Sequence, residues 1–172
     1  HDSAAAWTLE NPLDWAFFCC RLPDDGAEEI YTQGADILIA AQFGRPLKAT
    51  SANGGYRISG RAPFVSNCYD ADWISSTVLV DAGESAGGEP ETRMVYFPSE
   101  ECEIIDTWDV MGMRSTGSND ISVTDVYVPK ARTFPMVPDF EPGSHYRGPL
   151  YRLPLVGAAA SGIPTPMLGV AR

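Results

Sequence analysis

The spacing of hydrophobic residues changes once along the chain, from the period of a helix to the period of a strand. Within Pro12–Cys20 one helical face is apolar, and its members are Leu13, Ala16, Phe17 and Cys20. This spacing predicts a helix with Asn11 as its N-cap and the proline at its first position. A second short helix is expected to have Asp24 or Asp25 as its cap and to stop at Gly34. Both helices are too short to be stable alone, so each needs a surface to pack against.

From Ile37 onward the pattern is that of β-strands. The predicted strands are Ile37–Gln42, Leu47–Ser51, Tyr56–Arg61, Trp73–Val80, Arg93–Phe97, Glu103–Trp108 and Ile121–Val128. The Asn-Gly-Gly sequence at 53–55 predicts a hairpin, because Asn and Gly tolerate positive φ. In the last strand the apolar phase switches, which predicts a bulge near Asp125, and Pro129 ends the strand. Short strands joined by turn signals predict a mainly β protein, an antiparallel orthogonal sandwich or barrel.

Composition narrows the functional classes. With 12 basic and 23 acidic residues the net charge is −11, which argues against binding to nucleic acid or to an anionic membrane surface. No apolar run approaches the length of a membrane-spanning helix. The four cysteines show no C-x-x-C spacing, so we expect reduced, mostly buried thiols in a cytoplasmic protein.

Several common chemistries find no support in the sequence. Residues 83–87 match the G-x-S-x-G nucleophile elbow, but Gly-Glu-Pro follows where that motif needs a helix, so we interpret 81–92 as a solvated loop. The two histidines, His1 and His145, stand at opposite ends of the chain and the acidic residues are scattered, so no metal site is predicted. Neither G-x-G-x-x-G nor G-K-[ST] occurs.

Two stretches carry more specific information. Residues 54–68 form a hairpin strand that leads into an aromatic, an aliphatic and a hydroxyl side chain, Phe64, Val65 and Ser66; the second stretch is Trp108–Ser118. Such a triplet suits a flat heteroaromatic ring, because an aromatic side chain packs on the ring and a hydroxyl reaches its polar edge. The plainer alternative is that Phe64 belongs to the core and Ser66 caps a turn.

In these stretches the chain resembles the acyl-CoA dehydrogenase superfamily, and most closely its monooxygenase branch of two-component flavin hydroxylases and dibenzothiophene monooxygenases. The shared motifs occur in order as a G-G-Y-x-[IV]-[ST]-G hairpin, an F-x-S turn, a G-[ML]-R-x-T-G-S segment and a D-V-x-V-P strand end. The resemblance implies the end of an N-terminal helical domain at 1–35, a flavin-facing β-domain at 36–134, a Pro-rich linker at 135–150 and a truncated C-terminal helical domain at 151–172. The absence of a starting methionine and the end at Arg172 agree with a proteolytic or designed piece of a longer protein.

The resemblance also implies which residues meet a flavin. The Ser66 hydroxyl would lie near flavin N5 and O4, where it would stabilise a flavin–oxygen adduct, and Phe64 and Val65 would lie beside the ring. The other implied flavin-binding residues are Ala41 and Gln42 from the flavin-facing strand and, with less support, Trp108, Arg114, Thr116 and Ser118. The catalytic base is expected beyond Arg172, and no metal is expected.

The preferred function is therefore a flavin-dependent monooxygenase that uses FAD or FMN. The implied intact protein is a homotetramer, takes reduced flavin from a separate reductase and acts on a small aromatic or acyl substrate, whereas the isolated piece is not expected to retain flavin. Acyl-CoA dehydrogenase proper is the alternative, but Gln-Phe-Gly-Arg-Pro at 42–46 replaces the dehydrogenases' Thr-Glu-Pro. A non-enzymatic β-sandwich binding module is a third possibility.

Overall fold

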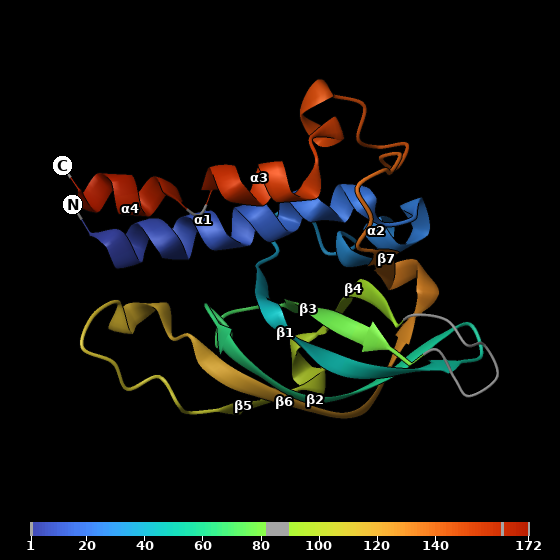
Figure 1. The fold of residues 1–172 in the computed structure, drawn as a ribbon, viewed down its shortest axis with the longest axis horizontal. Helices are drawn as coiled ribbons and strands as arrows, with labels where there is room; N and C mark the ends of the chain where they lie inside the picture. The colour runs from blue at the N-terminus through green and yellow to red at the C-terminus, as the bar shows by residue number, and fades with distance from the viewer. Residues whose placement is uncertain (1, 82–89, 163, 172) are drawn as a thin grey trace.

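A computed structural model describes residues 2–81, 90–162 and 164–171; the predicted loop at 81–92 lies largely outside them. The helices are α1 (Ser3–Phe18), α2 (Asp24–Ile30), α3 (Leu155–Gly162) and α4 (Pro164–Val170). The strands are β1 (Ile39–Ala52), β2 (Gly55–Val65), β3 (Trp73–Val80), β4 (Glu91–Pro98), β5 (Glu103–Ile105), β6 (Asn119–Pro129) and β7 (Thr133–Pro135). The helices form a layer over one face of the sheet, with α3 and α4 running back along α1 (Figure 1). Among these residues, no helix combines the length and the apolar character that crossing a membrane requires.

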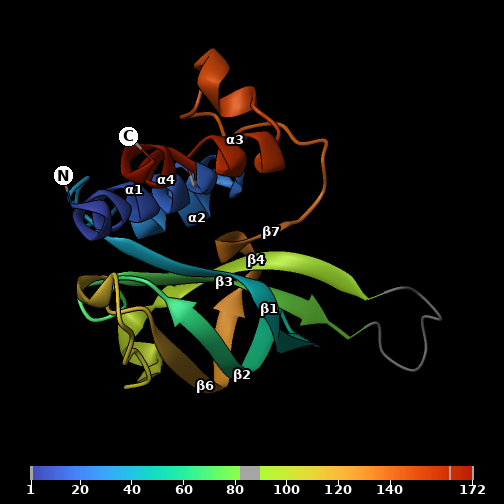
Figure 2. The same ribbon diagram turned by 60° about the vertical axis from the view of Figure 1, so that its left-hand side comes forward.

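The sheet confirms the expected mainly β class. Its strand order is β5-β6-β2-β1-β3-β4-β7, and Figure 2 shows it curving below the helices. Neighbouring strands in this order run antiparallel except β1 and β3, which are parallel, so the sheet is mixed and open. The reason is topological: β2 returns the chain to the end where β1 starts, and Trp73 then opens β3 beside Ile39.

The predicted irregularities of the strands are present. Gly54 has φ of 76° in the turn between β1 and β2, which confirms the hairpin. The bulge is confirmed at Asp125, which has φ of 55° where the register of β2 and β6 shifts. The two strands predicted on either side of 43–46 form one strand, β1, with a register shift between Gln42 and Leu47.

The hydrophobic core is divided between the two faces of the sheet. Along β4 the side chains alternate, so that Met94 and Tyr96 pack toward the helices while Val95 and Phe97 pack inside the curved sheet. All four are fully buried, which explains why this strand is a continuous apolar run rather than an alternating one. The cysteines are free thiols, three of them buried.

Helix α1 begins nine residues earlier than the sequence predicts. Asp2 is its N-cap, with Oδ1 accepting from the amide of Ala4 at 2.8 Å, and the helix continues through Pro12. A proline inside a helix leaves the carbonyl four residues earlier without its partner. Here that carbonyl belongs to Thr8, and the side-chain amide of Asn67 donates to it at 3.0 Å. The predicted start at Asn11 is wrong because a residue from another element supplies the missing hydrogen bond.

Two further boundaries differ from those predicted. Asp24 is the first residue of α2 rather than its cap, and its carboxylate accepts from the backbone amide of Ser144 at 2.7 Å instead. Strand β5 ends at Ile105 rather than at Trp108, because the amides of Thr107 and Trp108 both donate to the Asn119 side chain. The helical start predicted at 151–172 is confirmed as α3 and α4. The proposed division into domains stays a prediction.

Candidate functional site

A cavity of about 450 Å³ opens between the helical layer and one end of the sheet. The first turns of α1, the end of β2, the segment from Trp108 to Ser118 and α4 enclose it. Its largely apolar wall is made by Trp7, Phe64, Trp108, Met113, Met167 and Val170. Ser66, Thr116 and Ser118 bring hydroxyl groups to the same space. A cavity of this size with aromatic walls and few polar groups is typical of a small-molecule site.

Phe64 projects into this region from a strained backbone. Its φ is 62°, a left-handed backbone conformation that residues other than glycine rarely adopt. The side chain is 68% exposed, and its ring meets Trp108 edge to face with centroids 6.1 Å apart. An exposed aromatic ring held on a strained backbone is more typical of a binding residue than of a core residue.

The hydroxyl groups form a continuous chain of hydrogen bonds. The indole N–H of Trp7 donates to Ser66 Oγ at 2.9 Å. Ser66 Oγ lies 2.8 Å from Ser118 Oγ, which lies 2.7 Å from Thr116 Oγ1. Thr116 Oγ1 donates to the carbonyl of Met113 at 3.0 Å. Ser66, Thr116 and Ser118 are all buried, so the chain is shielded from bulk water apart from the cavity.

The loop after β2 is tied to its neighbours at several points. The backbone amide of Asn67 donates to the carbonyl of Thr116 at 2.9 Å, and its side chain binds Thr8 on α1. Within the segment before β6, the indole N–H of Trp108 donates to the carbonyl of Met113 at 3.1 Å. These bonds fix the triplet relative to α1 and to the segment before β6.

The structure brings together five of the residues predicted to meet a flavin. Phe64, Ser66, Trp108, Thr116 and Ser118 line the one cavity.

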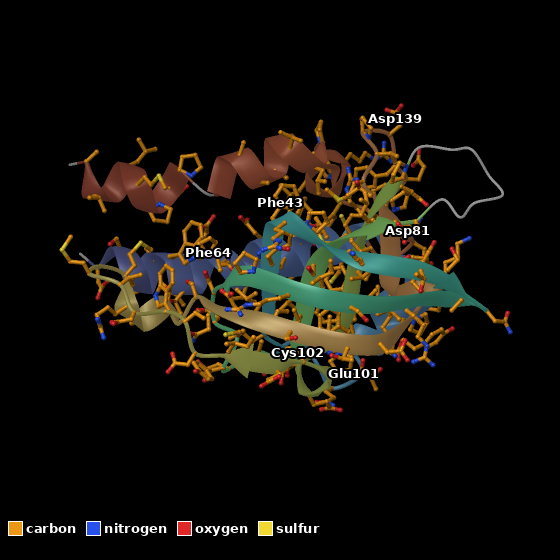
Figure 3. All side chains as sticks on the ribbon, turned by 60° about the horizontal axis from the view of Figure 1, so that its bottom comes forward. Phe43, Phe64, Asp81, Glu101, Cys102 and Asp139 are labelled. Carbon is orange, nitrogen blue, oxygen red and sulfur yellow. The ribbon has the colours of Figure 1, made fainter. Side chains whose placement is uncertain are left out.

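The other four predicted residues lie elsewhere. Val65 points into the sheet core and is fully buried. Ala41 packs in the core below α1, and the Gln42 side chain accepts from the Ser76 hydroxyl at 3.2 Å. Arg114 is exposed and pairs with Asp109. In Figure 3 Phe64 lies near the α4 end of the helical layer and Phe43, next to Gln42, lies further along toward α3.

Sequence reasoning missed the contribution of the helices to the cavity. Ser3, Trp7, Pro166, Met167 and Val170 also line it, from α1 and α4. Met113 lines it as well, from the segment before β6. The sequence does contain a signal for Trp7, because Asp2, followed by Ser3 and three alanines, is typical of a helix start. A helix that begins there and continues through Pro12 contains both Trp7 and Trp15. Nothing comparable in the sequence places Met167 or Val170.

An acidic pair lies on α1 one turn beyond Trp7. Burial, followed by the hydrogen bond and the charge of Asp14, raises the pKa of Glu10 to about 7. Burial also raises the pKa of Asp14. Both carboxylates lie against Gly162 at the end of α3, where an added Cβ would come within 2.3 Å of them. Among the described residues no group of three or more metal-binding side chains is present.

Comparison with known proteins gives a consistent result. No family model matches the chain. It is 34% identical over 150 residues to a pigment production hydroxylase of Rhodococcus sp., an alignment that covers 85% of this chain and 37% of the relative. It is 29% identical over 155 residues to the oxygenase component of an FADH₂-dependent resorcinol hydroxylase of Rhizobium sp.. That alignment covers 87% of this chain and 37% of the relative. The chain is thus similar in sequence to oxygenase components of flavin-dependent enzymes.

Several solved structures share the fold. The 3-HSA hydroxylase of Rhodococcus sp. RHA1 superposes with a TM-score of 0.89 at 24% identity, covering 98% of this chain and 45% of that one. XiaF from Streptomyces sp., solved with FADH₂ and glycerol, superposes with a TM-score of 0.81 at 22% identity; the match covers 97% of this chain and 42% of XiaF. FMN-bound TdsC from Paenibacillus sp. A11-2 superposes with a TM-score of 0.63 at 20% identity; the match covers 77% of this chain and 38% of TdsC. The fold is therefore the acyl-CoA dehydrogenase-like fold. The chain spans less than half the length of these proteins.

Proposed function

We propose that the chain forms the flavin-facing part of the oxygenase component of a two-component flavin-dependent monooxygenase. The observation that carries this proposal is the convergence of the Phe64 ring and the Ser66 hydroxyl in one cavity. Phe64 and Ser66 suit a flat heteroaromatic ring on chemical grounds, and relatives of the chain are named as flavin-dependent oxygenases. Neither the pigment production hydroxylase nor the resorcinol hydroxylase is named as an acyl-CoA dehydrogenase.

The residues of the cavity fit a flavin. Phe64 and Trp108 offer aromatic surface against which a flat ring can pack, and Ser66 offers a buried hydroxyl for its polar edge. The described residues that line the cavity carry no charged side chain, so the site would exclude water and leave a bound ring in an apolar setting. When bound, reduced flavin supplies the electrons that activate dioxygen for insertion of one oxygen atom into a substrate.

The finer assignments follow from the relatives and are part of the proposal. FAD is the first flavin to test, since the resorcinol hydroxylase is named as FADH₂-dependent and XiaF was solved with FADH₂; FMN is the second, since TdsC was solved with it. A separate reductase would deliver the reduced flavin, and a small aromatic ring is the expected substrate class. The tetramer, the cytoplasmic location and a catalytic base beyond Arg172 stay predictions.

Binding of reduced FAD and oxygen transfer by the complete protein test the proposal. We expect the protein to bind photoreduced FAD under anaerobic conditions and to place one atom of ¹⁸O₂ in a phenolic product, with resorcinol as the first probe. Failure to bind reduced flavin, or reduction of bound oxidised flavin by an acyl-CoA, would overturn it.

A pair of serine variants locates the binding site. Ser66→Ala should weaken the binding of reduced FAD about fivefold, the value of one lost hydrogen bond. Ser51→Ala is the matched control, because Ser51 is exposed on β1 and does not line the cavity. Equal affinities in the two variants would contradict the placement of the flavin.

A further inference from the structure

The hydrogen bonds around Ser66 can be assigned in only one direction if every contact is made. The chain contains four short contacts, from Trp7 through Ser66, Ser118 and Thr116 to the Met113 carbonyl. It also contains four hydrogens, one on the Trp7 indole nitrogen and one on each of the three hydroxyls. The contacts and the hydrogens are equal in number, so if every contact is a hydrogen bond, each hydrogen is donated in one of them.

The two ends of the chain set its direction. A carbonyl oxygen only accepts, so Thr116 donates to Met113 and must itself accept from Ser118. Ser118 has then used its hydrogen, so Ser66 must donate to Ser118. At the other end the Trp7 indole only donates, which agrees with Ser66 as its acceptor. The bonding capacity left to Ser66 Oγ is therefore one lone pair and no hydrogen.

We propose that Ser118 and Thr116 are positioning residues that hold the Ser66 hydroxyl as an acceptor toward the cavity. The cavity then favours a ligand that presents an N–H to Ser66 over one that presents only a lone pair. This inference rests on the proposed function, in which the ligand is a flavin. Reduced flavin carries a hydrogen on N5, whereas oxidised flavin has only a lone pair there, so the hydroxyl chain selects the reduced state.

Thr116 provides the sharpest test, because Ser118 lies between the Thr116 and Ser66 hydroxyls and links them through the chain. In Thr116→Val the hydrogen of Ser118 loses its acceptor, and Ser118 can turn to donate to Ser66. The Ser66 hydrogen is then free to point into the cavity and to bind N5 of oxidised flavin.

The measurement is the ratio of the dissociation constants of oxidised and reduced FAD for the complete protein, together with the midpoint potential of the bound flavin. We expect Thr116→Val and Ser118→Ala each to lower this ratio about fivefold, the equivalent of one hydrogen bond, and to lower the potential. Thr116→Ser keeps the hydroxyl, so its ratio of dissociation constants should equal that of the parent protein. Ser51→Ala, at an exposed position on β1 outside the cavity, should leave the ratio unchanged.

A double variant separates the chain from general damage to the cavity. In a Ser66→Ala background, Thr116→Val should cause no further change in the ratio. An unchanged ratio in Thr116→Val, or an equal change with and without Ser66, would overturn the inference while leaving the proposed function intact. Failure of the parent protein to bind FAD in either redox state would overturn both. Thermal unfolding of each variant confirms that it is folded before its ratio is taken.

Discussion

The side-chain amide of Asn67 completes the hydrogen bonding of Thr8, 59 residues earlier in the chain. Pro12 has no N–H to give to the Thr8 carbonyl, and Asn67 donates to it at 3.0 Å in place of the helix. Trp7, the residue before Thr8, donates to Ser66, the residue before Asn67. Two adjacent bonds therefore fasten α1 to the loop that carries the proposed flavin contacts.

The first prediction concerns this junction. Asn67→Gly tolerates the φ of 63° at this position but removes the amide, so the Thr8 carbonyl loses its partner. We expect the free energy of unfolding to fall by about 1–2 kcal/mol, measured by urea denaturation. In a Pro12→Ala background the helix supplies its own N–H, and Asn67→Gly should cost less by about 1 kcal/mol. Strict additivity of the two changes would show that Asn67 does not act through Thr8.

The second prediction separates stability from binding at Phe64. Phe64→Gly relieves a left-handed backbone conformation and removes an exposed ring, so stability should stay the same or rise by about 1 kcal/mol. Binding of FAD by the complete protein should nevertheless weaken, because the aromatic surface is lost. Thermal unfolding and anaerobic titration measure the two effects. A large loss of stability without a change in affinity would assign Phe64 to the fold rather than to the site.

The third prediction contrasts two helical glycines. Helix propensity alone says that Ala stabilises either position by up to about 1 kcal/mol. In α2, however, a Cβ on Gly26 would lie 1.9 Å from the carbonyl oxygen of Ala131, so Gly26→Ala should destabilise the protein by about 3 kcal/mol or more. In α3 a Cβ on Gly157 meets nothing within 4 Å, so Gly157→Ala should be neutral or stabilising. Denaturant midpoints of the two variants test this, and equal effects would contradict the close packing of α2.

The fourth prediction is a pH dependence that originates at Glu10. Its pKa in the folded chain is about 7, above the ordinary value of 4.5, so between these values the folded state binds more protons than the unfolded state. Stability should therefore fall as the pH rises through this window. Because the carboxyl is partly exposed, we expect a loss of only about 1 kcal/mol.

Substitution of the carboxyl checks this origin. Glu10→Gln should flatten the pH dependence of the unfolding free energy between pH about 5 and about 8. Glu101→Gln, at an exposed position, should leave it as it is in the parent. An unchanged slope in Glu10→Gln would assign the dependence to another group.

Most of the sheet and the centre of the candidate site could be predicted from the sequence. The hairpin at Gly54 and the bulge at Asp125 follow from local conformational preference and from the phase of apolar residues, which neighbouring residues alone determine. The triplet of Phe64, Val65 and Ser66 was recognisable for the same reason, because its spacing is local. Val65 lies in the core with Ala62, and not in the cavity, because the alternation of β2 is broken between them, where the register with β6 shifts and Phe64 has a positive φ.

The sequence by itself determined where the chain alternates, where it turns and which short motif carries an aromatic ring beside a hydroxyl. Only the tertiary structure decided that α1 continues through Pro12, that β5 ends at Ile105 and that Trp7 and α4 close the cavity over Ser66. The physical reason is the same in each case. Local preferences reside in adjacent residues, whereas the partners that override them, such as Asn67 for Thr8, come from segments that only folding brings together.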